Sequence, residues 1–349
     1  DPSSPVKIYM WHDMNAYGQY VDTVYFGTEV PGATIYTNPD ASRMFFRNHA
    51  STDEITIDKI YDSANPSTPY FFNTSKTTNM ERMFTFCELP SIGIPFDCTN
   101  GNGISPFGLM DTSNVTSLSF IFSVARNLDL TGIETWNVHK VTDISYLFDS
   151  AVDLKIPWGI GNWEFDNLQN VYNCFNIFYN SATKKTYEIN ITNWDLSHCD
   201  ASNLFIQDPN VASTIPGYIH RIGIGPKLID KNGKVFLPLA HMLEGFTSGS
   251  ADGNMCFNGT WQNENTGEQY FQRKNIDQSV SENKFSRIKF LTGNGESYTE
   301  FEEKYLANPI GMSGTYVFGK GYMVAYDFNG SSPDDENGAG EKFYCYKKT

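Results

Sequence analysis

The central part of the chain repeats one pattern of apolar and polar positions. Six segments fit a common frame: 41–45, 78–84, 114–122, 140–148, 170–178 and 201–205. The three longest align Val115/Leu118/Ile121/Phe122 with Val141/Ile144/Leu147/Phe148 and with Val171/Cys174/Ile177/Phe178. The Phe residues that end the six segments lie 26 to 39 residues apart, at positions 45, 84, 122, 148, 178 and 205. Periods of this size are typical of repeat proteins, in which each unit packs against the next.

Each unit is expected to contain a short strand and a short helix. Apolar residues at i, i+3, i+6 and i+7 of each segment predict one or two turns of helix. Polar side chains in Asp111–Asn114 are suited to cap the start of such a helix. Strand-like runs with apolar residues at i and i+2 precede the recurring Trp136, Trp163 and Trp194. These runs are Leu128–Leu130, Leu154–Ile156 and Tyr187–Ile191.

These features predict an α/β solenoid over residues 41–215, with a leucine-rich-repeat-like stack of short parallel strands and short helices. Residues 1–40 contain two strand-like runs, Val6–Trp11 and Tyr20–Phe26, and are expected to cap the first repeat. Residues 216–349 are expected to form a small β-rich α+β domain. In it, a helix should begin after Ser297 and end before Pro309. Hairpins are expected around Asn232–Gly233 and Gly319–Gly321.

The repeats resemble those of a known family. Asp111–Phe122 reads DTSNVTSLSFIF, and Asn193–Ser197 reads NWDLS. Both are similar to the repeat of BspA-like bacterial surface proteins, and the resemblance covers about residues 40–210. It implies a secreted or cell-surface location, with anchoring through a segment before residue 1, and adhesion to host matrix or to other cells. It implies no catalytic residue.

Composition narrows the range of partners. The formal net charge is −15, and the sequence has no cluster of Lys and Arg residues. A surface this acidic repels phosphate backbones, so nucleic acid is not expected as a partner. No apolar run is long enough to span a bilayer. Aromatic residues make up 15% of the chain, which favours large rings in the core or at interfaces.

Motifs for catalysis or metal binding are not found. The six Cys residues form no CxxC pair, and the six His residues show no ligand spacing, so no metal or other cofactor is expected. Cys87 could pair with Cys98, and Cys256 with Cys345, or all could remain buried thiols. Nucleophile-elbow, phosphate-loop and dinucleotide fingerprints are also absent. The protein is therefore expected not to be an enzyme.

The function that these observations favour is non-enzymatic binding or adhesion. Outward positions on the strands nominate a binding face, made of Asp129, Thr131, Lys155, Glu188, Asn190 and Thr192, with Trp158 nearby. Its partner would be a protein or glycan on a host or neighbouring cell. The first alternative is a structural assembly protein, such as a phage virion component, a filament or a surface-layer subunit that self-assembles. The second is a carbohydrate-active enzyme whose chemistry lies in residues 216–349.

Overall fold

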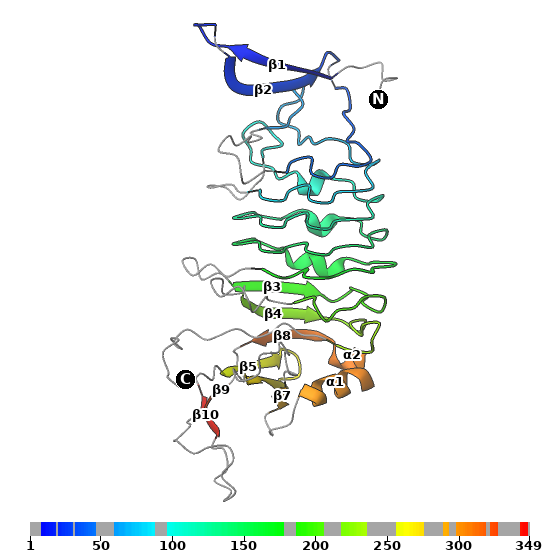
Figure 1. Ribbon diagram of the computed structural model, residues 1–349, viewed down its shortest axis with the longest axis vertical. Helices are drawn as coiled ribbons and strands as arrows, with labels where there is room; N and C mark the ends of the chain where they lie inside the picture. Colours follow the sequence, from blue (N-terminus) through cyan, green and yellow to red (C-terminus); the bar gives the residue numbers. More distant parts are fainter. Residues whose placement is uncertain are drawn as a thin grey trace, which may run out of the picture.

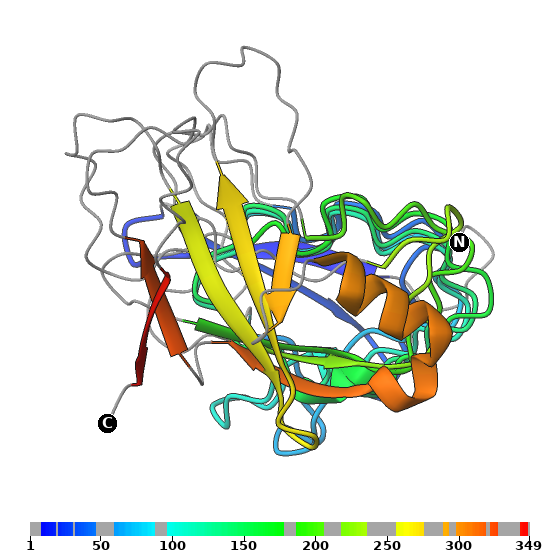
Figure 2. The same cartoon turned by 90° about the horizontal axis from the view of Figure 1, so that it is seen from below.

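The protein is an elongated column of coil layers with a sheet at each end (Figure 1). The computed structural model describes residues 8–18, 20–30, 32–46, 59–87, 96–177, 186–205, 218–235, 256–275, 289–292, 298–318, 322–326 and 343–347. We call the described residues between 32 and 205 the column. Seen along its axis, its layers follow nearly the same outline (Figure 2). Each layer is therefore positioned by its two neighbours.

The regular elements lie mainly at the two ends. At the N-terminal end, β1 (Ile8–Met14) and β2 (Tyr20–Thr28) form an antiparallel hairpin. Within the column the short 3₁₀ helices are η1 (Phe107–Leu109), η2 (Ile133–Thr135) and η3 (Trp158–Asn162). The remaining elements are β3 (Thr186–Ile191), β4 (Tyr218–Ile224), β5 (Cys256–Asn263), β6 (Gln269–Asn275), β7 (Lys289–Thr292), α1 (Tyr298–Ala307), α2 (Pro309–Met312), β8 (Gly314–Phe318), β9 (Tyr322–Tyr326) and β10 (Phe343–Lys347). A six-stranded sheet has the order β3-β4-β8-β5-β6-β7, and β9 pairs with β10.

The expected α/β solenoid is wrong. Within the described residues, both α-helices lie beyond residue 297, and the segments expected to be helical are turns. The expected strands at Leu128–Leu130 and Leu154–Ile156 are reduced to the single parallel bridge between Asp129 and Lys155. Of the three strand runs in the repeats, only Tyr187–Ile191 lies in a regular strand, β3. A helix layer opposite a strand layer is therefore missing from the described part of the column.

Hydrogen bonds between layers replace those of a helix. We call residues 41–45, 80–86, 118–124, 144–150, 171–175 and 201–205 the turn segments. In one of them, Phe120 N–H donates to the carbonyl of Ser145 in the next layer at 2.9 Å, whereas Ile121 N–H donates back to Leu118 at 3.2 Å. Alternate N–H groups thus leave the layer, so the i to i−4 bonds of an α-helix cannot form. Left-handed residues such as Phe120 (φ 56°) and Val124 (φ 57°) separate successive turns.

The polar side chains expected to cap a helix join layers instead. Asp111 Oδ1 accepts from the backbone N–H of Ser113 at 2.9 Å, which closes a local turn. Thr112 Oγ1 donates to the carbonyl of Asn137 in the following layer at 3.0 Å. Asn114 Nδ2 donates to the carbonyl of Ser75 in the preceding layer at 2.8 Å. These small polar residues therefore form hydrogen bonds within their own layer, to the following layer and to the preceding layer.

A file of Phe rings forms the core of the column. Phe84, Phe122 and Phe148 stack with centroid distances of 5.9 and 6.0 Å, and Phe148 stacks on Phe175 at 5.6 Å. The sequence alignment placed Phe178 in this file, and that placement is wrong. Cys174 carbonyl accepts from Phe148 N–H at 3.0 Å, so the third unit is shifted by three residues. Phe178 itself lies outside the described residues.

A second file contains the three recurring tryptophans. Trp136, Trp163 and Trp194 stack at 6.2 and 5.9 Å, and all three are buried. Each indole N–H donates to a carbonyl one layer earlier, and the acceptors are those of Phe107, Ile133 and Ile160. The buried Trp therefore has its polar atom satisfied, which the low dielectric of a core requires.

The C-terminal region follows part of the expectation. The expected helix is α1, and it ends before Pro309 as the sequence indicated. The strands β8 and β9 flank residues 319–321, but they do not pair with each other. β8 pairs with β4 and β5, whereas β9 pairs with β10. Residues 230–234 form a turn instead of a hairpin, with Lys234 carbonyl accepting from Asp230 N–H at 2.8 Å.

Candidate functional site

The first three residues of the expected binding face form one cluster. Lys155 Nζ lies 2.7 Å from Asp129 Oδ2 and 3.3 Å from Thr131 Oγ1. The Thr131 hydroxyl donates to Asp129 Oδ1 at 2.5 Å. Burial acts to raise the pKa of Asp129, but hydrogen bonds from Lys155 and Thr131 outweigh it and hold that pKa below its usual value. Asp129 is therefore ionised and paired at neutral pH.

Two more of the expected residues meet at Arg221, which the sequence did not single out. Arg221 donates to Glu188 and to Glu264, both at 3.1 Å. Its guanidinium also lies 4.6 Å from the centre of the Trp158 ring. Glu188 and Arg221 are partners in the parallel register of β3 and β4, so strand pairing places them together. Charges of opposite sign therefore alternate across these layers.

Asn190 and Thr192 lie together, and Asn190 is buried. Asn190 Oδ1 accepts from both the backbone N–H and the hydroxyl of Thr192. A Cβ placed on Gly161 or Gly223 would come within 2.1 or 2.5 Å of the Asn190 side chain. Asn190 thus fills the space that two glycines leave between layers. Its geometry is that of a spacer within the column, with little surface for a partner.

A row of rings on the side of the column was not found by sequence reasoning. Phe120 and Tyr146 stack at 4.2 Å, and Tyr146 contacts Tyr172 at 5.3 Å. The guanidinium of Arg82 lies 4.2 Å from the centre of the Phe120 ring. Arg82, Phe120 and Tyr146 all have left-handed backbones at equivalent positions. The usable signal was the recurrence of aromatic residues shortly before the file of Phe rings, two positions before it for Phe120 and Tyr146 and three for Tyr172.

The N-terminal hairpin carries a second exposed aromatic group. The register of β1 and β2 puts Tyr9 opposite Gly27 and Trp11 opposite Tyr25. Trp11 and Tyr25 stack at 5.7 Å, and a Cβ on Gly27 would lie 3.3 Å from the Trp11 ring. Exposed fractions are 40% for Tyr9, 46% for Trp11 and 40% for Tyr25. We call Tyr9, Trp11 and Tyr25 the aromatic face.

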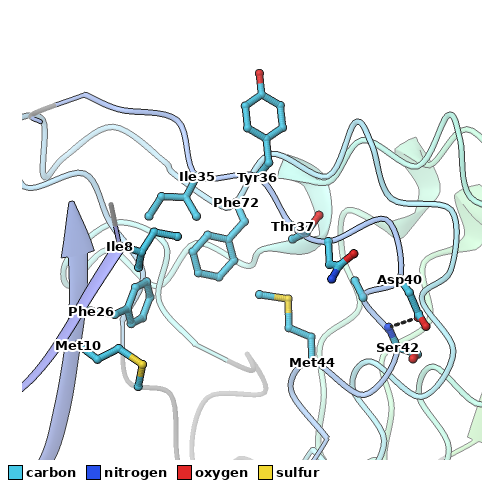
Figure 3. Close-up of a pocket in the computed structure, with 12 residues that line it drawn as sticks. Ile8, Met10, Phe26, Ile35, Tyr36, Thr37, Asp40, Ser42, Met44 and Phe72 are labelled. Atoms are coloured by element: carbon cyan, nitrogen blue, oxygen red, sulfur yellow. Dashed lines mark hydrogen bonds between the residues drawn. The ribbon is translucent and has the colours of Figure 1, made fainter. Parts of the chain in front are cut away.

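The opposite side of the hairpin lines a groove of about 440 Å³ against the first layer (Figure 3). Ile8, Met10 and Phe26 point into it from the hairpin (Figure 3). The residues that line this N-terminal groove are Ile8, Met10, Phe26, Ile35, Tyr36, Thr37, Asn38, Asp40, Ala41, Ser42, Met44 and Phe72. Phe26 contacts Phe72 at 5.6 Å, which connects the hairpin to the core. Met10 and Met44 nevertheless remain exposed. The hairpin therefore covers the end of the column only in part.

The cysteine thiols whose surroundings the structure describes are not in disulfides and are mostly buried. Cys87, Cys98, Cys174 and Cys199 are free thiols, so the structure does not pair Cys87 with Cys98. Burial raises the pKa of Cys98 and of Cys199 to about 12, which keeps both thiols protonated. The side chains of Cys256 and Cys345 lie outside the described residues. No group of three His, Cys, Asp or Glu side chains in the described ranges is placed to hold a metal ion.

The helices that the structure describes are too short or too polar to cross a bilayer. Comparison with curated proteins gives no match, and comparison with solved structures gives none either. One family model matches, over residues 96–217, and its description reads "Mycoplasma protein of unknown function, DUF285". The match covers the central layers, including the file of Trp rings and Phe122, Phe148 and Phe175 of the file of Phe rings, so this part of the chain is similar to that family.

Proposed function

We propose that the protein is a non-enzymatic binding protein, secreted or displayed at a cell surface, that adheres through the N-terminal hairpin. Its partner is a protein or glycan on a host or neighbouring cell. The observation that carries the proposal is the aromatic face, where three large rings are about half exposed at one end of a long molecule. Trp and Tyr supply contact area at little entropic cost and dominate many binding interfaces. Exposed apolar patches on soluble proteins often mark interaction sites.

The resemblance to BspA-like surface repeats supports the adhesive function. The net charge of −15 supports a partner other than nucleic acid. The expected face around Asp129 and Lys155 is the weaker candidate, because its charges already pair with each other across layers. In the aromatic face Trp11 and Tyr25 stack on each other, yet 46% and 40% of these side chains remain exposed. We therefore place adhesion at the end of the column.

Binding of the fluorescently labelled protein to cultured epithelial cells, measured by flow cytometry, tests the proposal. Replacing Trp11 by Ser should reduce bound fluorescence at least tenfold. The matched control is Ile310→Ser, since Ile310 is 80% exposed on α2 at the far end. Unchanged binding of the Trp11 variant would contradict the proposal. Treating the cells with protease or glycosidase first shows whether the partner is a protein or a glycan.

A further inference from the structure

The turn segments bond to one another in a fixed direction. Alternate N–H groups of each segment donate to alternate carbonyls of the next segment along the chain. Ala41, Arg43 and Phe45 donate in this way to Asn79, Glu81 and Met83, at 3.0, 2.9 and 3.1 Å. The next pair of segments repeats the arrangement, from Met80, Arg82 and Phe84 to Ser117, Ser119 and Ile121. An inner segment thus uses its donors on one side and its acceptors on the other.

The first turn segment has only half of this arrangement. The carbonyls of Asp40, Ser42 and Met44 are equivalent to those of Asn79, Glu81 and Met83. No donor among the described residues reaches these three carbonyls. The carbonyls between them are used inside the segment, since Ala41 carbonyl accepts from Met44 N–H at 3.2 Å and Arg43 carbonyl accepts from Phe46 N–H at 3.1 Å. The first layer therefore presents an open row of acceptors, which we call the carbonyl row.

The carbonyl row and the N-terminal groove coincide. Asp40, Ser42 and Met44 line the groove on the side of the first layer, and Ile8 and Met10 face them from β1 (Figure 3). A chain lying in the groove would meet hydrogen-bond acceptors on one side and apolar side chains on the other. Adding a strand to an open edge combines these two kinds of contact.

We propose that the N-terminal groove binds an extended peptide segment of a partner protein, which donates alternate backbone N–H groups to the carbonyls of Asp40, Ser42 and Met44. The inference rests on the proposed function and identifies the partner as a polypeptide. Apolar side chains at alternate positions of the segment pack against Met10, Phe26 and neighbouring groove residues. The bound segment extends the column by one layer and supplies the donors that the carbonyls of Asp40, Ser42 and Met44 lack among the described residues.

A second copy of the chain fits the groove less well. Two N-terminal ends brought together would place one carbonyl row against another, so acceptors would face acceptors. The opposite end of the column leads into the paired strands β3, β4 and β8 (Figure 1). Two copies that each carry a charge of −15 also repel each other. These observations favour a different polypeptide as the occupant.

Peptide binding to the full-length protein, measured by calorimetry, tests the inference. The probe is a seven-residue peptide with valine at alternate positions, threonine between them and lysine at each end. In an extended chain, alternate N–H groups point to opposite sides. Methylating the backbone nitrogens of one alternate set should therefore abolish binding, whereas methylating the other set should leave Kd within about threefold. Equal effects of the two methylation patterns would overturn the inference.

A pair of variants on β1 tests the location. Met10→Glu puts a charge into the groove and should raise Kd at least tenfold. Met14→Glu is the control, because Met14 lies on the same strand outside the groove and both side chains are mostly exposed, at 74% and 60%. Circular dichroism checks that both variants fold. Equal weakening by both, or a dimer in sedimentation that Met10→Glu abolishes, would overturn the inference. Loss of peptide binding alone would leave Trp11-dependent cell binding, and the proposed function, intact.

Discussion

At the scale of single residues, the buried tryptophans both fill the core and join the layers. Trp163 stacks on Trp136 and Trp194, and its indole N–H donates to the Ile133 carbonyl at 2.9 Å. The Ile133 carbonyl also accepts from the backbone N–H of Trp136 at 3.0 Å, so the indole adds a second hydrogen bond, with a net contribution of about 0.5–1.5 kcal/mol. Each Trp therefore contributes more to stability than its apolar area alone.

Replacing Trp163 by Phe is expected to lower the free energy of unfolding by about 3 kcal/mol, because a cavity remains and the Ile133 carbonyl keeps only the hydrogen bond from the backbone N–H of Trp136. Urea unfolding followed by circular dichroism measures the change. Trp11→Phe is the control: the exposed hairpin position should change stability by less than about 0.5 kcal/mol. Similar values for the two variants would show that Trp163 has no special role in joining layers.

Asp149 gives the protein a pH-dependent weakness. Burial raises its pKa above the ordinary value, although Asn176 Nδ2 donates to it at 2.6 Å. The folded state therefore binds its proton more tightly than the unfolded state does. The stabilising contribution of protonated Asp149 is fully present below the pKa that Asp149 has in the unfolded chain. It is lost as the pH rises through the pKa that Asp149 has in the folded protein.

Asp149→Asn should therefore raise the free energy of unfolding at pH 7, and the gain should vanish towards pH 3. The amide oxygen still accepts from Asn176, so the change removes mainly the charge. Asp111→Asn should act in the opposite direction, because hydrogen bonds from Ser113 lower the pKa of Asp111. Urea unfolding at both pH values measures the effects, and a lower stability of the Asp149 variant at pH 7 would refute the assignment.

At the scale of elements, the turn segments explain where sequence reasoning succeeded and failed. The Phe and Trp files were predicted, apart from the misplaced Phe178, because large rings at regular spacing are visible in the sequence. The helices were wrong because successive turns place apolar residues at the same spacing as a helix does. Only backbone hydrogen bonds to another layer distinguish successive turns from a helix. These hydrogen bonds depend on residues that are distant in the sequence. Arg221 and the aromatic face were missed for the same reason, since neither strand pairing nor exposure can be read locally.

Val124 has an unfavourable backbone for its type, which offers a test of the turn geometry. A β-branched residue at φ 57° is strained, whereas Asn accepts this region. Val124→Asn should raise the free energy of unfolding by roughly 1 kcal/mol, the order of the left-handed penalty. Val152→Asn is the control, because Val152 is equally half-buried but has no positive φ and should not gain. A loss of stability in the Val124 variant would refute the strained turn.

At the scale of the whole molecule, repulsion among like charges opposes the local ion pairs. Pairs such as Asp129 with Lys155 are exposed, and exposed pairs contribute only about 0–1 kcal/mol each. The net charge of −15 acts on the entire chain. We therefore expect repulsion to be the larger effect at low ionic strength.

Raising NaCl from about 10 mM to about 150 mM shortens the screening length from ~30 to ~8 Å and should raise the melting temperature. Differential scanning calorimetry measures it. A molar-equivalent addition of sucrose, which is uncharged, is the control and should have a smaller effect. If salt lowers the melting temperature instead, the ion pairs across layers dominate the electrostatics.

The equivalence of Ser117 and Asp143, which are joined in consecutive parallel bridges, makes the molecule adjustable in height. Residues 117–142 form one complete circuit of the chain. Deleting these residues would connect Thr116 to Asp143. Residues of the preceding layer would then contact the equivalent residues of the layer after the deleted one, and Met80 N–H would donate to the Asp143 carbonyl in place of the Ser117 carbonyl. The shortened molecule would lose about 4.8 Å, the distance between adjacent strands, and keep both termini unaltered. Duplication of the same circuit would extend the reach of the hairpin by an equal step.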